Sequence, residues 1–190
     1  TPGSGPGHLG LFGYDPLEFQ VGRGVIEALG LGVELKPGDV CARANFATLD
    51  AKGIVTDRRA GRIATEVCEK LVALLSAKIK KIGDTEVLIK AGKEHRFVVV
   101  FRGAGLEGPL TDADPNREGF AIPTVKPRDE NNPKQVKMAA LIADFYKAAL
   151  PIIAKEKPAN GFLMRGIAHQ PHIPLFADRY LLKPAALSVY

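Results

Sequence analysis

The sequence predicts an α+β fold in which an antiparallel sheet carries two long helices on one face. Residues 63–82 and 138–153 place apolar side chains at steps of three and four, which is the repeat of an amphipathic helix. Residues 38–49 alternate between the two faces of a strand, and 86–90 and 96–102 are short runs rich in β-branched residues. The five residues between the last two runs include a glycine, which predicts a hairpin and therefore antiparallel neighbours.

The chain begins with a segment that composition assigns to a loop. Residues 1–14 hold five glycines and two prolines. Asp15-Pro16 then has the cap and first-position residues of a helix, which Gly22 to Gly24 interrupt and Gly30 ends.

The strand at 38–49 is the first element of the predicted sheet. Its period of two places Arg43 and Asn45 on the same face. A turn at Asp50 to Gly53 leads back into a short strand at 54–56. The helix that follows has Thr56 or Asp57 as candidate caps, and Gly83 closes it.

A long connection joins the hairpin to the second helix. Residues 103–132 are rich in Gly, Pro, Asp and Asn, and a loop of this length is typical of a functional or mobile segment. Asn132-Pro133 starts the helix, and Pro151 is expected to kink it or begin a new turn. Three shorter elements complete the prediction: a strand at 162–165, a helix at 175–180 and a strand at 185–190.

Composition limits the classes of protein. Apolar residues make up 46% of the 190 residues and charged residues 25%, as in ordinary globular chains. No apolar run of 18 residues and no leader peptide is visible, so we expect no membrane partner and a cytoplasmic location. Cys41 and Cys68 fit no metal spacing, and we expect two buried thiols.

The net charge of +5 is compatible with nucleic acid or a small anion as the partner. The basic residues are spread along the chain, there is no Trp, and aromatic residues total 7%. Stacking platforms for nucleic acid are therefore scarce, and we expect no nucleic-acid partner.

Arginines near element ends are the main candidates for binding an anion. Arg58, Arg59 and Arg62 cluster at the expected start of a helix, where guanidinium groups match phosphate oxygens. Arg102 and Arg165 each end a strand before a glycine. Solvated surface arginines are the alternative interpretation, but with Arg43 they form the set that a small, multiply charged ligand needs.

Other polar residues give weaker signals. Ser4 lies among glycines that let a backbone approach an anion, although a flexible loop explains the same pattern. For His95, His169 and His172 we favour structural or surface roles. Asp112 and Asp114 are expected to pair with arginines or cap turns.

Several strings of the sequence resemble one known family. They are Gly-Ser-Gly-Pro-Gly-His-Leu at 3–9, Asp-Arg-Arg-Ala-Gly-Arg at 57–62, Phe-Arg-Gly-Ala-Gly-Leu at 101–106, Thr-Asp-Ala-Asp-Pro at 111–115 and Leu-Met-Arg-Gly at 163–166. In this order they resemble the archaeal-type cofactor-independent phosphoglycerate mutases of the alkaline phosphatase superfamily. The resemblance runs through the whole chain.

The resemblance implies a domain organisation. Residues 1–37 would carry the nucleophile loop and helices of a metal-binding α/β domain. Residues 38–167 would form the inserted substrate-binding α+β domain, and 168–190 would return to the metal-binding domain. The chain would then be a central piece of an enzyme, inactive by itself, and its oligomeric state stays open.

The resemblance also implies an activity. The enzyme would interconvert 3-phosphoglycerate and 2-phosphoglycerate in glycolysis and gluconeogenesis through a phosphoserine, without 2,3-bisphosphoglycerate. Two divalent metal ions, Mn²⁺ or else Mg²⁺, Co²⁺ or Zn²⁺, would activate the serine. Another phosphatase or phosphonate-processing enzyme of the superfamily, or an anion-binding module without catalysis, is the alternative.

The family's site residues map onto this sequence by motif. Ser4 would be the nucleophile and a metal ligand, with the other ligands outside this chain. Asp57 would be catalytic, by orienting arginines or handling a proton of the glycerate. The substrate-binding set would be His8, Arg43, Asn45, Arg58, Arg59, Arg62, Arg102 and Arg165.

Overall fold

A computed structural model describes residues 4–19, 21–183 and 185, with the backbone alone at residue 4. The chain divides into two compact units. The larger unit spans Val21–Gln170, and the smaller one combines residues 1–20 with 171–190. Each unit is described by itself.

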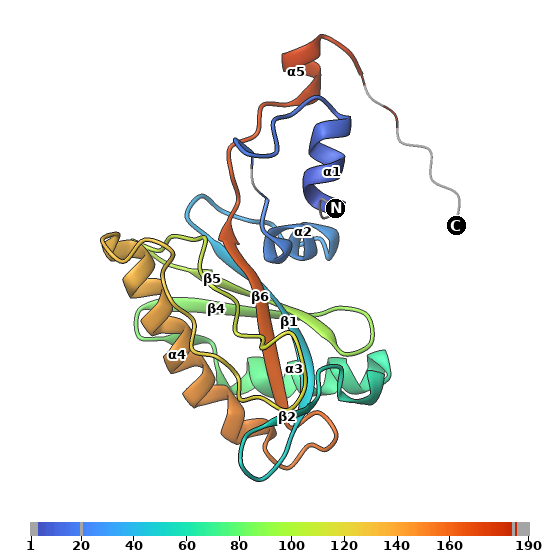
Figure 1. Ribbon diagram of the computed structural model, residues 1–190, viewed down its shortest axis with the longest axis vertical. Helices are drawn as coiled ribbons and strands as arrows, with labels where there is room; N and C mark the ends of the chain where they lie inside the picture. The colour runs from blue at the N-terminus through green and yellow to red at the C-terminus, as the bar shows by residue number, and fades with distance from the viewer. Residues whose placement is uncertain (1–3, 20, 184, 186–190) are drawn as a thin grey trace. The chain divides into compact units, whose positions relative to one another are not determined.

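An antiparallel sheet forms the centre of the larger unit (Figure 1). Its strand order is β2-β1-β5-β4-β3, and β6 also pairs with β1. Every pairing is antiparallel, as the sequence predicts. The strands are β1 (Val40–Leu49), β2 (Val55–Asp57), β3 (Lys81–Ile82), β4 (Thr85–Ala91), β5 (Arg96–Arg102) and β6 (Gly161–His169).

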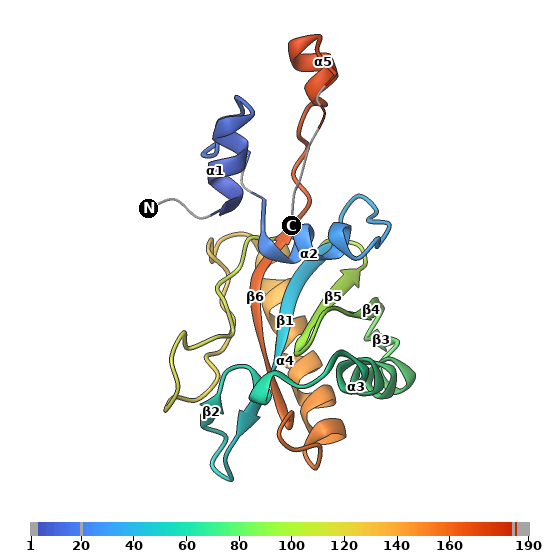
Figure 2. The ribbon, with the colours of Figure 1, turned by 90° about the vertical axis from the view of Figure 1, so that its right-hand side faces the viewer.

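Two long helices cover one face of this sheet, α3 (Thr65–Lys78) and α4 (Pro133–Ile153) (Figures 1 and 2). Their buried residues, such as Leu75 and Phe145, pack against Ala44 and Phe46 of β1 and Phe97 of β5 in the main core. The predicted α+β arrangement is confirmed.

Helix α3 is shorter than the apolar repeat of residues 63–82 predicted. α3 ends at Lys78, and Ile79 is already extended. Ile82 belongs instead to β3, where it pairs with Thr85 across a two-residue turn that contains Gly83 at φ 55°. The apolar spacing continues past the helix because Ile79 and Ile82 pack against the same core in extended conformation.

The other face of the sheet is only partly covered. α2 (Arg23–Gly30) packs Val25 and Ala28 on this face, against Cys41 of β1 and Val98 and Val100 of β5. The expected boundary at residue 37 is therefore displaced, because this packing joins α2 to the sheet. The division falls at Gln20 and Gln170 instead.

The second helix begins as predicted. Asn132 precedes α4, and its side chain accepts hydrogen bonds from the backbone N–H groups of Lys134 and Gln135. The helix continues through Pro151 to Ile153. The short strand expected at 162–165 is the middle of the longer β6.

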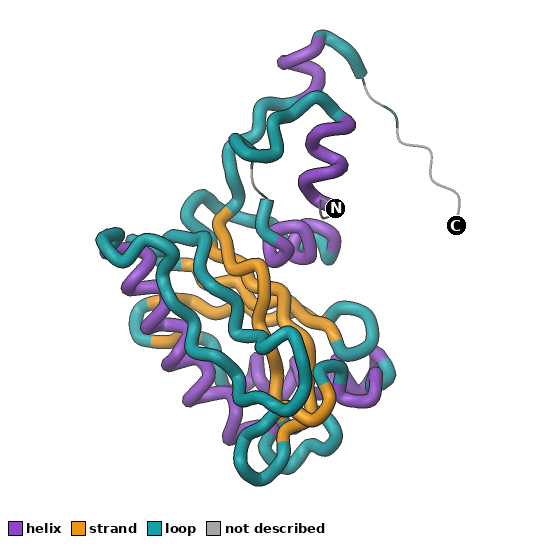
Figure 3. The backbone as a smooth tube through the Cα atoms, in the orientation of Figure 1, coloured by secondary structure: helices purple, strands orange, loops and turns teal. Residues whose placement is uncertain are grey.

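The connection between β5 and α4 is irregular, as expected (Figure 3). It is nevertheless held to the sheet, because Ala113 forms a bridge with Met164 of β6 and Leu110 N–H donates to Ile167. This attachment places Asp112 and Asp114 beside the middle of β6, where Arg165 lies.

The smaller unit contains α1 (Ser4–Leu11) and α5 (Phe176–Tyr180). The loop predicted for residues 1–14 is wrong over α1, and the helix predicted to start at Asp15 is a turn, in which the Asp15 carboxylate accepts from Leu17 N–H. The predicted helix at 175–180 is confirmed. The strand predicted for 185–190 lies almost entirely outside the described residues. Within the described part of the chain, no helix has the length and apolar character needed to cross a membrane.

Candidate anion-binding site

The uncovered part of the second sheet face carries a cluster of arginines. Arg43 and Asn45 of β1 share this face with Cys41, and the pairing register places Arg43 opposite Arg165 of β6 and Asn45 opposite Arg96 of β5. α2 covers Cys41, whereas the polar end of the face stays open. Because side chains alternate along β1, one face of the strand carries both Cys41, on which α2 packs, and the residues that form the floor of a polar site.

The connection from β2 to α3 supplies three more arginines. Arg58, Arg59 and Arg62 lie in a tight turn that includes a short 3-10 helix (Ala60–Arg62). Asp57 shapes this turn, because its two carboxylate oxygens accept hydrogen bonds from the N–H groups of Arg59 (2.7 Å) and Gly61 (2.6 Å). Asp57 was expected to cap the following helix, and it holds the arginine turn instead.

Together these side chains line a pocket of about 270 Å³. Seven of the nine lining residues are arginines, which is far more than a solvated surface patch requires. The lining residues are Arg23, Arg43, Asn45, Arg58, Arg59, Arg62, His95, Arg96 and Arg165.

Three carboxylates offset part of this charge. Asp114 is fully buried and accepts two hydrogen bonds from Arg58, at 3.0 Å from Nε and 2.7 Å from Nη2. Arg165 Nε lies 3.5 Å from Asp114 and 3.6 Å from Asp112, and Arg43 Nε lies 3.5 Å from Glu27. Seven guanidinium groups line the pocket and only some of them are paired with these carboxylates, so the pocket keeps an excess of positive charge. The expectation that Asp112 and Asp114 pair with arginines is confirmed.

Electrostatics and unsatisfied hydrogen bonds both indicate a site prepared for an anion. The Arg58 pKa is raised because Asp114 accepts its hydrogen bonds. The Arg43 pKa is lowered, mainly by burial, with Glu27 opposing the shift. The buried Nε atom of Arg96 has no hydrogen-bond partner, and those of Arg43 and Arg165 lie at ion-pair distance from a carboxylate without forming a hydrogen bond. Such donors are costly to bury unpaired, so an acceptor-rich ligand would stabilise them.

His95 is a lining residue to which the sequence assigned only a structural role. It is 3% exposed and lies just before β5. Its pKa is lowered by burial first and then by Arg96, Arg59 and Arg62, and Glu94 opposes the shift. The imidazole is therefore held neutral inside a positively charged pocket.

The predicted binding residues divide into two groups. The structure brings together Arg43, Asn45, Arg58, Arg59, Arg62 and Arg165. Arg102 is not among them, because it binds Asp39 at 2.7 Å and the Glu34 carbonyl at the opposite end of β5 from Arg96. The hydrogen bond to Asp39 raises the Arg102 pKa and ties the side chain to that end of the strand, outside the pocket.

The two predicted residues near the N-terminus lie in the smaller unit. Ser4 is the first residue of α1, and its side chain lies outside the described part of the structure. His8 lies in the same helix. Their roles stay predictions.

Arg23 and Arg96 are pocket residues that no sequence motif indicated. Arg96 was visible in principle, because it is two residues from Val98 on the face that also carries Arg43. Arg23 enters only through the packing of α2. Gly166 permits this packing, because a Cβ there would lie 2.6 Å from the Arg23 backbone nitrogen.

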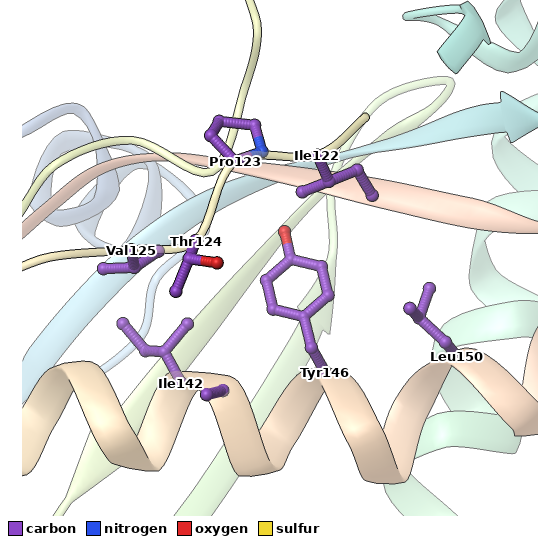
Figure 4. Close-up of a pocket in the computed structure, with 8 residues that line it drawn as sticks. Ile122, Pro123, Thr124, Val125, Ile142, Tyr146 and Leu150 are labelled. Atoms are coloured by element: carbon purple, nitrogen blue, oxygen red, sulfur yellow. The ribbon is translucent and has the colours of Figure 1, made fainter. Parts of the chain in front are cut away.

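A second pocket of about 250 Å³ has a different character (Figure 4). Tyr146, Ile142 and Leu150 rise from α4 toward the loop segment 122–125. Burial raises the Tyr146 pKa, and its ring stacks on Phe162. The lining has no charged side chain, so this pocket offers nothing to an anion.

Neither thiol nor carboxylate groups form a metal centre in the described residues. Within 4–19, 21–183 and 185, no group of three or more His, Cys, Asp and Glu side chains is placed to hold a metal ion. Cys41 and Cys68 are buried free thiols, as expected, and burial raises their pKa to about 12 and about 11. The described side chains therefore do not fit a metal pair.

Comparison with known proteins identifies relatives along the whole chain. A protein of Thermosipho africanus named "Probable 2,3-bisphosphoglycerate-independent phosphoglycerate mutase" is 49% identical over 191 residues, and one of the same name from Thermotoga maritima is 50% identical over 190. All of this chain is covered in both cases, but only 46% of each relative. The chain thus spans slightly less than half the length of these relatives.

A solved structure has the same fold. The cofactor-independent phosphoglycerate mutase of Thermoplasma acidophilum superposes with a TM-score of 0.73 at 35% identity, over 93% of this chain and 49% of that protein. The family described as 2,3-bisphosphoglycerate-independent phosphoglycerate mutase matches residues 1–160. This match covers most of the chain and includes every residue that lines the arginine pocket except Arg165, so the chain belongs to the 2,3-bisphosphoglycerate-independent phosphoglycerate mutase family.

Proposed function

We propose that the complete protein interconverts 3-phosphoglycerate and 2-phosphoglycerate and that the pocket in this chain holds the phosphoglycerate. The observation that carries the proposal is the set of seven arginines around a pocket of about 270 Å³. A phosphoglycerate bears a carboxylate and a phosphate, together about three negative charges near neutral pH. The excess of positive charge in the pocket complements such a ligand.

The arrangement of donors supports the same ligand. Arg43, Arg96 and Arg165 lie on the floor, whereas Arg59 and Arg62 come from the turn that Asp57 holds. Two banks of guanidinium groups suit a ligand with two anionic groups, because each group can be bound bidentately. A ligand held at both ends keeps its oxygens in place while a phosphoryl group is transferred.

The proposal assigns the transfer itself to Ser4. The serine oxygen would form a bond to phosphorus while the bond from phosphorus to one glycerate oxygen breaks, and the serine proton would pass to that oxygen. Transfer back to the other glycerate oxygen would regenerate the serine. The two divalent metal ions of the proposal would activate the serine oxygen when bound. Apart from Ser4, the proposal places their ligands outside this chain.

Calorimetric titration of 3-phosphoglycerate into the chain at pH 8 tests the binding function. Arg59→Gln removes a lining charge whose side chain forms no ion pair with the other described residues. We expect it to weaken binding by about 10- to 100-fold, the usual worth of a charge-assisted hydrogen bond. Arg117→Gln is the control, since it removes the same charge from an exposed loop residue that stacks on the Phe120 ring and does not line the pocket. Equal affinities of the two variants would contradict the proposal.

The proposal also predicts that the chain alone is a binding protein without turnover. With Mn²⁺ and 3-phosphoglycerate, we expect no formation of 2-phosphoglycerate by the 190-residue chain. Turnover at an enzyme's usual rate, on the order of 10 per second, would show that the chain holds a complete active site.

A further inference from the structure

The arginine pocket contains a small number of side chains that can accept a hydrogen bond. Seven of its nine lining residues are arginines, and a guanidinium group only donates. The other two are Asn45 and His95. Phosphate and carboxylate groups only accept when ionised, so the arginines satisfy them completely. An acceptor in this pocket suits a ligand that also carries a donor, such as a hydroxyl.

The surroundings of His95 determine which ring nitrogen is the acceptor. Nδ1 is sealed from solvent and has no hydrogen-bond partner, and the nearest carboxylate oxygen, Glu94 Oε2, lies 3.8 Å away. A carboxylate on this side favours a proton on Nδ1. In the neutral ring the other nitrogen, Nε2, then carries the lone pair. Because Nδ1 is sealed, Nε2 is the nitrogen that can meet a ligand in the pocket.

The charged groups around His95 keep this lone pair available. Arg96 of β5 and Arg59 and Arg62 of the β2–α3 turn face the ring with positive charge, and Glu94 of the ring's own turn is the opposing carboxylate. With burial, the three arginines lower the imidazole pKa from its ordinary value. At neutral and higher pH the ring is therefore an acceptor and not an eighth cation.

We propose that His95 is a specificity-determining residue, whose Nε2 accepts a hydrogen bond from the free hydroxyl of the bound phosphoglycerate. The inference rests on the proposed function, because it specifies which part of that ligand each side chain binds. The arginines bind the two anionic groups, and His95 accepts a hydrogen bond from the hydroxyl between them. An anion without the hydroxyl would leave Nε2 unpaired in a largely buried position, and sites of this kind discriminate strongly against the analogue that lacks the donor.

Two ligands that differ only in the hydroxyl test the proposal. They are 3-phosphoglycerate and 3-phosphonooxypropanoate, in which hydrogen replaces the hydroxyl at carbon 2. Calorimetric titration of each into the chain at pH 8 gives a ratio of dissociation constants. We expect the unmodified chain to prefer 3-phosphoglycerate by about 10- to 100-fold. His95→Phe, which keeps a ring of similar shape, should bring the ratio to about one, and His95→Gln, which restores an acceptor, should recover part of the preference.

The pH dependence of this ratio separates the proposed role from a structural one. Lowering the pH through the His95 pKa adds a proton to Nε2 and converts the acceptor into a donor. The preference for the hydroxyl should therefore fall as the pH falls, although the added charge favours anions in general. Protonation of the phosphate affects both ligands alike and cancels from the ratio. In His95→Gln the ratio should not change with pH.

Each outcome decides the matter. A ratio near one in the unmodified chain at pH 8, or a preference that survives in His95→Phe, overturns the inference. If His95→Phe fails to fold, the unmodified chain and His95→Gln still decide it, because equal pH profiles overturn it. If neither ligand nor inorganic phosphate binds the unmodified chain, the proposed function fails, whereas binding of all three without discrimination refutes only the role of His95.

Discussion

The buried carboxylate of Asp114 should contribute more to stability than any exposed carboxylate of the chain. It binds Arg58 through two hydrogen bonds, lies 3.5 Å from Arg165 Nε, and accepts from Asn116 N–H at 2.8 Å. Asp114→Ala would leave two guanidinium groups and one N–H without this partner. Breaking a fully buried ion pair costs about 3–5 kcal/mol. The Arg58 and Arg165 side chains are 28% and 29% exposed, so water compensates part of the loss.

We therefore expect Asp114→Ala to lower the free energy of unfolding by about 2–4 kcal/mol, which corresponds to a fall in Tm of about 4–16 °C for a chain of this size. Scanning calorimetry together with urea unfolding measures both quantities. Asp144→Ala is the matched control, because its ion pair with Lys147 is mostly exposed and should change stability by less than about 0.5 kcal/mol. If the two variants were equally stable, the reasoning that Asp114 anchors the arginines would be refuted.

Two further predictions concern the face of the sheet that α2 covers. Gly24→Ala would place a Cβ on the Cys41 carbonyl group and within 2.7 Å of the Ala42 Cα atom, so we expect a loss of about 2–4 kcal/mol in urea unfolding, an overpacking cost at its upper range. Gly30→Ala in the same helix meets nothing within 4 Å and should be neutral or stabilising by up to about 1 kcal/mol, and a similar loss there would contradict the packing argument. For Cys41 we expect no reaction with a thiol reagent at pH 8 in the folded chain, since burial raises its pKa to about 12. In denaturant the thiol should react fully. Rapid labelling of the folded chain would show that α2 does not shield this residue from solvent.

Local patterns account for much of the fold and part of the site. The period of two over residues 40–49 predicts that Arg43 and Asn45 share one face of the strand, and the pairing register confirms it. Asn132 is recognisable as a cap because its side chain satisfies N–H groups only two and three residues away. Such features depend on neighbours in sequence, and these are visible in the chain itself.

Patterns that competed with other local signals were misleading. The glycines of residues 1–14 favour a loop, yet α1 forms from Ser4 to Leu11. The apolar repeat of α3 extended to Ile82, because an extended segment beside the helix also turns apolar side chains toward the core. In both cases the residue types left more than one backbone conformation possible, and the conformation that the pattern favoured is not the one that forms.

By itself, the sequence determined the antiparallel α+β fold, the two core helices and most of the arginines that line the pocket. Only the tertiary structure decided which arginines meet. Arg96 and Arg102 end the same strand and look alike in sequence, but six residues of extended chain separate them by about 20 Å. Strand register brings Arg96 to Asn45 and leaves Arg102 with Asp39. The same pairing of β1 with β5 places His95, which directly precedes β5, beside the arginines. Strand register depends on segments that lie far apart in the chain, so neighbouring residues in the sequence do not predict it.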